Sequence, residues 1–249
     1  MSPIQQAGIA FALIVASGIA GAWLRSKLPE HHLTGDSKDV IKLSVALIAT
    51  MSALVLALLF ASTHTSFERT SSYVSRMTAD IAELDKLLGE YGPEARPIRA
   101  ALRAEIGPLI GSILQDHAPA RPAGADKGHG DSILYMLRGL APTDKVQTSI
   151  QARALQVSTD LGQTQLALAA QPADSISNTF MFVLVLWLMF IFAVFSMSSP
   201  PNPTLFAVIF LCSLSASAAI YLILELAHPF DGLMQISPET LRTALKPLG

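Results

Sequence analysis

The chain has 249 residues, of which 51% are hydrophobic and only 14% are charged. This composition is too apolar for an ordinary soluble domain. The formal net charge of -2, without a basic tail, argues against nucleic acid as a partner. The single cysteine, Cys212, excludes an intramolecular disulfide. The composition therefore predicts a multi-pass membrane protein whose first partner is the lipid bilayer.

The first apolar block covers residues 4–24 and is interpreted as a retained span. No Lys or Arg precedes it, whereas Arg25 and Lys27 follow it, which is the reverse of a signal peptide. Small residues recur at every fourth position and form a smooth ridge: Gly8, Ala12, Ala16 and Ala20. Such a ridge lets another helix approach closely in lipid.

The second apolar block, residues 40–62, is long enough to cross a hydrocarbon core of about 30 Å as a helix. One side carries a second small ridge: Ala49, Ala53, Ala57 and Ala61. Matching ridges predict that the first two spans pack as a tight antiparallel hairpin. The opposite side faces lipid or lines a narrow, mostly dry passage, and it carries Ser44, Ile48, Met51, Val55, Leu59 and Ser62.

Residues 64–177 form a long polar segment that we expect to be mostly helical. Apolar residues with the spacing of a helix face run up to a break at Gly92-Pro93: Tyr73, Met77, Ile81, Leu84, Leu88 and Tyr91. Further helices are expected after that break, with a kink at Gly107-Pro108, and after caps at Asp131 and Thr143. The helix faces need partners in this segment, in the spans or in another copy of the chain.

Two groups of histidines and carboxylates suggest metal ligands at first sight. They are Glu30, His31, His32 and Asp36 in the first loop, and Asp116, His117, Asp126, His129 and Asp131 in a Gly- and Pro-rich stretch. Neither group has the paired ligand spacing of a metal site, so solvated loop residues are the favoured interpretation. The sequence predicts no metal site and no cofactor.

The third span, residues 179–197, is bulky throughout, with Ala193 almost its only small residue, and this suits the lipid-facing periphery. The fourth span, residues 204–226, carries Ser213 and Ser217 one turn apart, where hydroxyls bond to their own backbone or across to another helix.

Glu225 lies in the last turn of the fourth span, where the helix dipole and the hydrocarbon edge both disfavour an anion. It should have a partner, and His64 and Arg69 are the nearest candidates by topology. The simpler alternative is a carboxylate that extends outward to the membrane interface. Residues 227–249 form a C-terminal tail with a possible amphipathic helix.

Together these features predict an all-α membrane protein with four transmembrane helices in two hairpins. A transmembrane hairpin (residues 1–63) is followed by the helical extramembrane segment, a second hairpin (residues 178–226) and the tail. Basic residues near the two membrane faces tie in number, and the rule that the first span dominates then places the first loop inside. The helical segment would accordingly lie outside.

Three stretches in this order carry a resemblance to a known family. They are LPEHHL followed by SKDVIKLSVALIATMSALVLALLFAS; LDKLLGEYGPEA with its following arginines; and LELAHPFDGLMQIS with ETLRTAL. The chain resembles a bacterial family of four-span membrane proteins of unknown function labelled bestrophin-like. The resemblance implies a pentamer around an axis lined by the second span, anion conduction, and a helical segment in the cytoplasm. Ala46, Ala57 and His64 depart from the family's usual glycines and lysine, and the last departure weakens anion attraction.

Three functional hypotheses remain open. The first is an oligomeric ion channel of the bacterial inner membrane. The second is a non-conducting assembly or sensing protein that binds an unknown protein through its helical segment. The third is a stator-like, ion-driven subunit, because that class shares the layout of two spans, a long helical segment and two further spans. An enzyme is not expected, because the sequence has no paired carboxylates, nucleophile with a base, or phosphate-binding loop.

Overall fold

The computed structural model of the chain describes residues 2–27, 36–104, 129–170, 178–198 and 202–228. Its helices are α1 (Pro3–Lys27), α2 (Asp36–Tyr91), η2 (Pro93–Ala95), α4 (His129–Arg138), α5 (Lys145–Ala169), α6 (Asn178–Ser198) and α7 (Pro203–Ala227), and residues 96–104 are also helical. No strand occurs in these described ranges, so the predicted all-α class is confirmed.

Four of these helices, α1, α2, α6 and α7, are long and apolar enough to cross a membrane, and they include the four predicted spans. The largest difference from the prediction is the length of α2, which is one helix of 56 residues. It joins the second span to the first predicted extramembrane helix without a break. The reason is visible in the sequence, since no Gly or Pro occurs between Asp36 and Leu88.

Gly92 and Pro93 end α2 where the sequence predicts a break. Gly92 adopts a φ of 125°, a conformation that side chains rarely tolerate, and a Cβ atom there would lie 2.9 Å from Oε2 of Glu94. Pro93 then starts the short 3₁₀ turn η2. The chain reverses at this point and continues as the helical residues 96–104.

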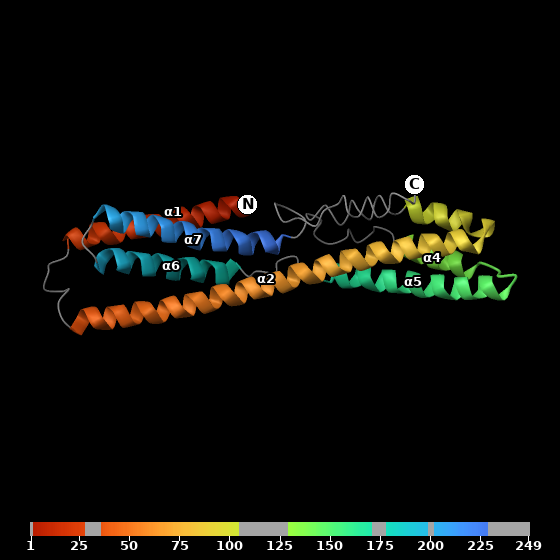
Figure 1. Ribbon diagram of the computed structural model, residues 1–249, viewed down its shortest axis with the longest axis horizontal. Helices are drawn as coiled ribbons and strands as arrows, with labels where there is room; N and C mark the ends of the chain where they lie inside the picture. Colours follow the sequence, from red (N-terminus) through yellow and green to blue (C-terminus); the bar gives the residue numbers. More distant parts are fainter. Residues whose placement is uncertain (1, 28–35, 105–128, 171–177, 199–201, 229–249) are drawn as a thin grey trace. The chain divides into compact units, whose positions relative to one another are not determined.

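The chain divides into two compact units, which are described separately. The transmembrane unit comprises residues 1–67 and 174–228, and the helical unit comprises residues 68–173 and 229–249. Figure 1 shows α1, α6 and α7 together in the first unit, and α4 and α5 in the second. Because α2 belongs to both units, its two parts are treated with the unit to which they belong.

In the transmembrane unit, α1 packs on α6 and α7 through its glycines. A Cβ atom on Gly21 would lie 2.1 Å from the carbonyl oxygen of Ala193 on α6, so only glycine permits this contact. A Cβ atom on Gly18 would lie 3.1 Å from Ile209 on α7. In a membrane, an apolar side chain gains little by moving from lipid into a contact with protein. Helices in lipid therefore associate through close backbone approach of this kind.

Two hydrogen bonds add to the packing of α1. The Ser217 hydroxyl donates to the carbonyl of Ala7 at 2.7 Å, which confirms that a serine of the fourth span bonds across to another helix. Arg25 donates from Nη1 to the carbonyl of Met197 at 2.9 Å, at the C-terminal end of α6. The buried hydroxyls of Ser196 and Ser213 have no hydrogen-bond partner in the described part of the chain.

The prediction of a lipid-facing third span is correct for only part of α6. Phe180, Phe182 and Phe195 are exposed, as expected for a lipid-facing helix. Other positions of α6 are not peripheral, because Leu184 is fully buried and Ala193 contacts α1 through its backbone. The one small residue of the span is therefore where the neighbouring helix approaches closest.

The helical unit has a side-chain core. Leu84 and Leu88 of α2 pack with residues of α4, α5 and the segment after η2, which include Ile98, Leu102, Ile133, Leu137, Ala154 and Val157. Buried residues of α2 recur every seventh position in two series: Thr70, Met77, Leu84 and Tyr91, and Val74, Ile81 and Leu88. A seven-residue repeat is typical of helices that pack as in a coiled coil. The predicted apolar face is confirmed for all its members except Tyr73, which is half-buried.

The starts of α4 and α5 differ from those that the predicted caps imply, by three residues for α4 and by one for α5. Asp144, not Thr143, caps α5, since its side chain accepts a hydrogen bond from the backbone N–H of Gln147 at 2.7 Å. Thr143 instead contacts Gln147 through its own N–H and hydroxyl. Because α4 begins at His129, the predicted cap Asp131 lies inside the helix.

Candidate functional site

The apolar part of α2 packs on the transmembrane unit through a narrow stripe. Val55, Leu56 and Leu59 contact a cluster from the other three helices of this unit, formed by Ala10, Leu184, Ile220 and Leu224. Val45, Ser52 and Thr63 are buried along the same stripe. Among the described residues, the other helices cover only this side of α2.

The six predicted passage-lining residues divide into two groups. Ser44, Met51 and Ser62 are exposed. Ile48, Val55 and Leu59 are half-buried, and the last two pack on the neighbouring helices. The predicted face of α2 therefore overlaps only partly with the exposed face. Ser44, Met51 and Ser62 can face lipid or an axis, whereas the other three residues lie at the edge of the contact with the neighbouring helices.

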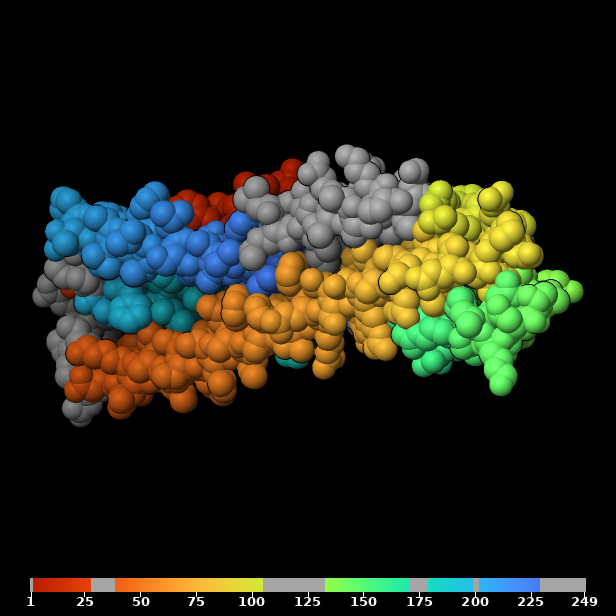
Figure 2. All heavy atoms as spheres, turned by 45° about the vertical axis from the view of Figure 1, so that its right-hand side comes forward, coloured from red at the N-terminus to blue at the C-terminus, as the bar shows by residue number. Residues whose placement is uncertain are grey.

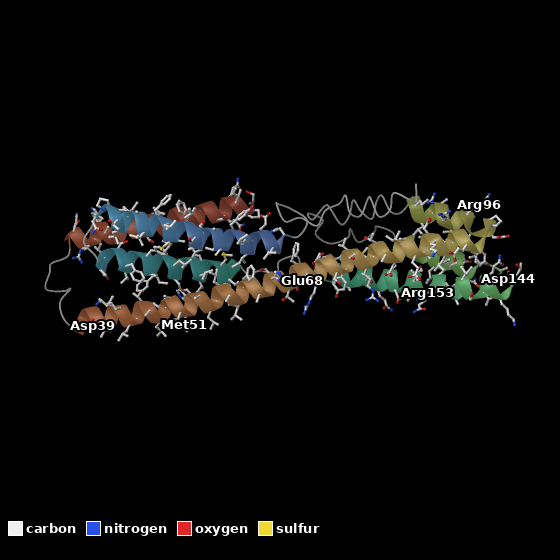
Figure 3. The ribbon with its side chains drawn as sticks, in the orientation of Figure 1. Asp39, Met51, Glu68, Arg96, Asp144 and Arg153 are labelled. Carbon is white, nitrogen blue, oxygen red and sulfur yellow. The ribbon has the colours of Figure 1, made fainter. Side chains whose placement is uncertain are left out.

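The uncovered side of α2 is dominated by large apolar residues, of which only Met51 is among the predicted passage-lining residues. Leu43 is 72% exposed, Met51 is 50% exposed, and the others with exposed side chains are Leu47, Leu54, Leu58 and Phe60. Figure 2 shows this part of α2 as an uncovered orange surface, and Figure 3 marks Met51 on it. These side chains require lipid or another protein chain as a neighbour.

The predicted hairpin of ridge against ridge is wrong within one chain. Gly8, Ala12, Ala16 and Ala20 are exposed, as are Ala53, Ala57 and Ala61, whereas Ala49 is half-buried. A Cβ atom on Gly8 would meet nothing within 4 Å, in contrast to Gly21 on the opposite face of α1. The contacts of α1 use a different set of small residues, which includes Gly18 and Gly21.

Several hydroxyl groups along α2 donate to carbonyl groups of the same helix. Ser52 donates to the carbonyl of Ile48 at 2.8 Å, and Thr63 donates to those of Leu59 and Phe60 at 2.9 and 3.0 Å. Between Lys42 and Glu68, residue His64 is the only titratable side chain in the sequence. A passage along α2 would thus be apolar with a few hydroxyl oxygens, which is the chemistry of a pore that gates by dewetting.

Glu225 is only 3% exposed, at the end of α7. Its carboxylate is hydrogen-bonded to Tyr221, one turn earlier on the same helix. His64 and Arg69, its predicted charge partners, are both exposed residues of α2, and the ring of His64 lies 5.8 Å from that of Phe60. The burial of Glu225 does not fit the alternative of a carboxylate that extends outward. Its pairing with a cation stays a prediction.

The second family stretch builds the turn of the helical unit. Asp85 on α2 is buried and accepts two hydrogen bonds from Arg99, Nε–Oδ1 at 2.7 Å and Nη2–Oδ2 at 2.5 Å. Arg103 adds a longer contact of 3.4 Å. Burial alone would raise the pKa of Asp85, but these two guanidinium groups outweigh it and lower that pKa. This part of the motif is therefore structural, because it fastens the chain after the turn to α2.

Several predicted elements lie outside what the structure describes. They are the loop with Glu30, His31 and His32, the stretch with Asp116, His117 and Asp126, the kink at Gly107-Pro108, and the tail after residue 228; the side chains of Asp36, His129 and Asp131 are likewise not described. Within the described ranges, no group of three or more His, Cys, Asp or Glu residues could hold a metal ion.

Comparison with known proteins agrees with these features. A family model described as Bestrophin-like domain matches residues 12–241, which is most of the chain. The resemblance noted in the sequence is thereby confirmed. No protein of curated function and no solved structure matches the chain.

Proposed function

The chain belongs to the Bestrophin-like family, and from this premise we propose that it forms a homo-oligomeric ion channel in the bacterial inner membrane. In this proposal α2 lines the axis of a ring, with five copies as the expected number. Its exposed Ser44, Met51 and Ser62 then face the passage.

The observation that carries this proposal is the poor burial of α2. Only 11% of its most apolar window is buried within one chain, compared with 39% for α1. A helix that exposes both a ridge of alanines and a row of large apolar residues suits a position between neighbouring copies. The corresponding buried shares of α6 and α7 are 22% and 33%.

The composition of α2 also bears on conduction. The proposed passage has no fixed charge between Lys42 and Glu68, so it holds water poorly and opens by wetting. With a histidine at position 64, the mouth of the passage lacks a permanent cation. We therefore propose weak selectivity between anions and cations.

The test is ion flux in liposomes that contain the purified protein. Wild type should conduct above empty liposomes, Met51→Ser should raise the flux severalfold by wetting the passage, and Met51→Trp should abolish it. Leu211 on α7 is the matched control, because it is 64% exposed in the transmembrane unit but not on α2. Its Ser and Trp variants should conduct as wild type does. Equal effects at Met51 and Leu211, or no flux in wild type, would refute the proposal.

A second candidate function is a non-conducting assembly that binds a protein through the helical unit. It is supported by exposed apolar side chains on α4 and α5, namely Tyr135, which is 79% exposed, Val146 and Leu166. This alternative predicts a stable co-purifying protein that is lost in Tyr135→Ala, with no ion flux in liposomes.

A further inference from the structure

Three helix ends of the transmembrane unit lie together. Toward the C-terminal end of α1, a Cβ atom on Gly18 would lie 3.1 Å from Ile209 of α7. Toward its N-terminal end, the carbonyl of Ala7 accepts a hydrogen bond from Ser217. Residue numbers fall along α7 as they rise along α1, so α7 begins beside the end of α1 (Figure 1). The hydrogen bond from Arg25 to the last turn of α6 brings the end of that helix to the same place.

This group of helix ends carries positive charge. Arg25 and Lys27 lie in the last turn of α1, whereas α1 and α6 have no acidic residue and α7 has one only in its last turn, at the opposite end. Asp39 and Lys42, near the start of α2, pair with each other at 3.6 Å. Over residues 25–42 the sequence holds four basic and three acidic residues, so an excess of positive charge remains. The surface at this end therefore suits an anionic partner.

An exposed aromatic ring accompanies this charge. Trp23 is 60% exposed, and the ammonium group of Lys27 lies 4.3 Å from the centre of its ring, one turn further along α1. Indole rings gather at the boundary between hydrocarbon and headgroups, because the ring is apolar and its N–H is polar. The cation–π contact keeps the ammonium group beside the ring, and so at the level of the headgroups.

We propose that Trp23 and Lys27 bind the headgroup of an anionic phospholipid, and that the charge of Arg25 adds to the attraction. The ammonium group of Lys27 pairs with the lipid phosphate, and the indole ring packs against the glycerol backbone and the upper part of an acyl chain. A zwitterionic lipid carries its own cation beside the phosphate, so Lys27 gains less from it. The site therefore prefers phosphatidylglycerol to phosphatidylcholine. This preference does not depend on whether the protein conducts ions.

The test uses the two tryptophans of the chain, Trp23 and Trp187, as separate reporters. In Trp187→Phe, the fluorescence of Trp23 is quenched by lipids that carry bromine near the headgroup end of their acyl chains. In vesicles of phosphatidylglycerol and phosphatidylcholine, bromine on the first lipid should quench Trp23 more strongly than bromine on the second. Adding Lys27→Gln should reduce this preference roughly fivefold, because one cation near an anionic surface contributes about that factor. Lys27→Arg should keep the preference.

Two controls keep the test decisive. Trp23→Phe leaves Trp187, a half-buried residue of α6, a helix without charged residues, and both brominated lipids should quench it equally. Salt at about 1 M should remove the preference at Trp23, since it screens charges beyond about 3 Å. This salt series tests the proposal even if Lys27→Gln fails to fold. Equal quenching of Trp23 by the two lipids, a preference that is unchanged in Lys27→Gln or in high salt, or the same preference at Trp187 would overturn it.

Discussion

The two units of the chain are stabilised by different physical means. In the transmembrane unit, Gly18 and Gly21 bring the backbone of α1 against its neighbours. In the helical unit, large side chains such as Leu84 and Leu137 are fully buried in a common core. Lipid offers apolar side chains much the same environment as a protein interior, whereas water does not. The transmembrane unit therefore depends on close fit, and the helical unit depends on burial and ion pairs.

The largest effect should come from adding one methyl group to the transmembrane unit. Gly21→Ala places a Cβ atom 2.1 Å from a backbone oxygen of α6, which cannot move aside like a flexible side chain. We expect a loss of about 3 kcal/mol or more in the free energy of unfolding. Gly8→Ala is the matched control on the same helix and should be close to neutral. Thermal unfolding in detergent measures both. Equal stability of the two variants would show that the close contact at Gly21 does not stabilise the transmembrane unit.

In the helical unit, the largest single polar effect should come from Asp85. Asp85→Asn weakens the pairing with Arg99 and Arg103 and should cost about 2 kcal/mol at neutral pH. Because the pKa of Asp85 is lowered, its stabilisation is present above pH 3.8 and is lost as the pH falls through the lower folded value. A denaturant titration at two pH values checks this. The variant should lose part of the acid sensitivity of wild type, and an unchanged sensitivity would count against the ion pair.

A smaller effect is expected at the start of α5. Asp144→Ala removes the side chain that accepts from the N–H of Gln147, and the loss of such a cap costs about 1 kcal/mol. Asp144→Ser should restore most of the stability, since a serine hydroxyl also caps. If Ser and Ala behave alike in thermal unfolding, the cap is not what Asp144 contributes.

The smallest effect belongs to the surface of α2. Lys86 and Glu90 lie 3.9 Å apart with both side chains largely in solvent, so Lys86→Gln should change stability by less than about 0.5 kcal/mol. If Lys86→Gln lowered the free energy of unfolding nearly as much as Asp85→Asn, burial would not explain why the Asp85–Arg99 pair is stronger than the Lys86–Glu90 pair.

The spans and the apolar face of the helical unit could be predicted because they depend on runs and periods in the sequence. The choice between Gly8 and Gly21 could not, since both are glycines on the same helix and only the neighbouring backbone distinguishes them. The pair Asp85–Arg99 was missed for a related reason. Its members lie 14 residues apart, and they meet only because the chain reverses at Gly92. On α2, the spacing of the small residues indicated that the helix has two different faces. It did not indicate which face packs against the other helices of the same chain.

The most direct test of the proposed channel is cryo-EM of the protein in lipid nanodiscs. It would determine how many copies assemble and which helix lies at the axis. We expect a ring in which Ser44, Met51 and Ser62 of α2 surround a central passage. A monomer, or a ring whose axis is sealed by lipid or by the alanine ridges, would contradict it.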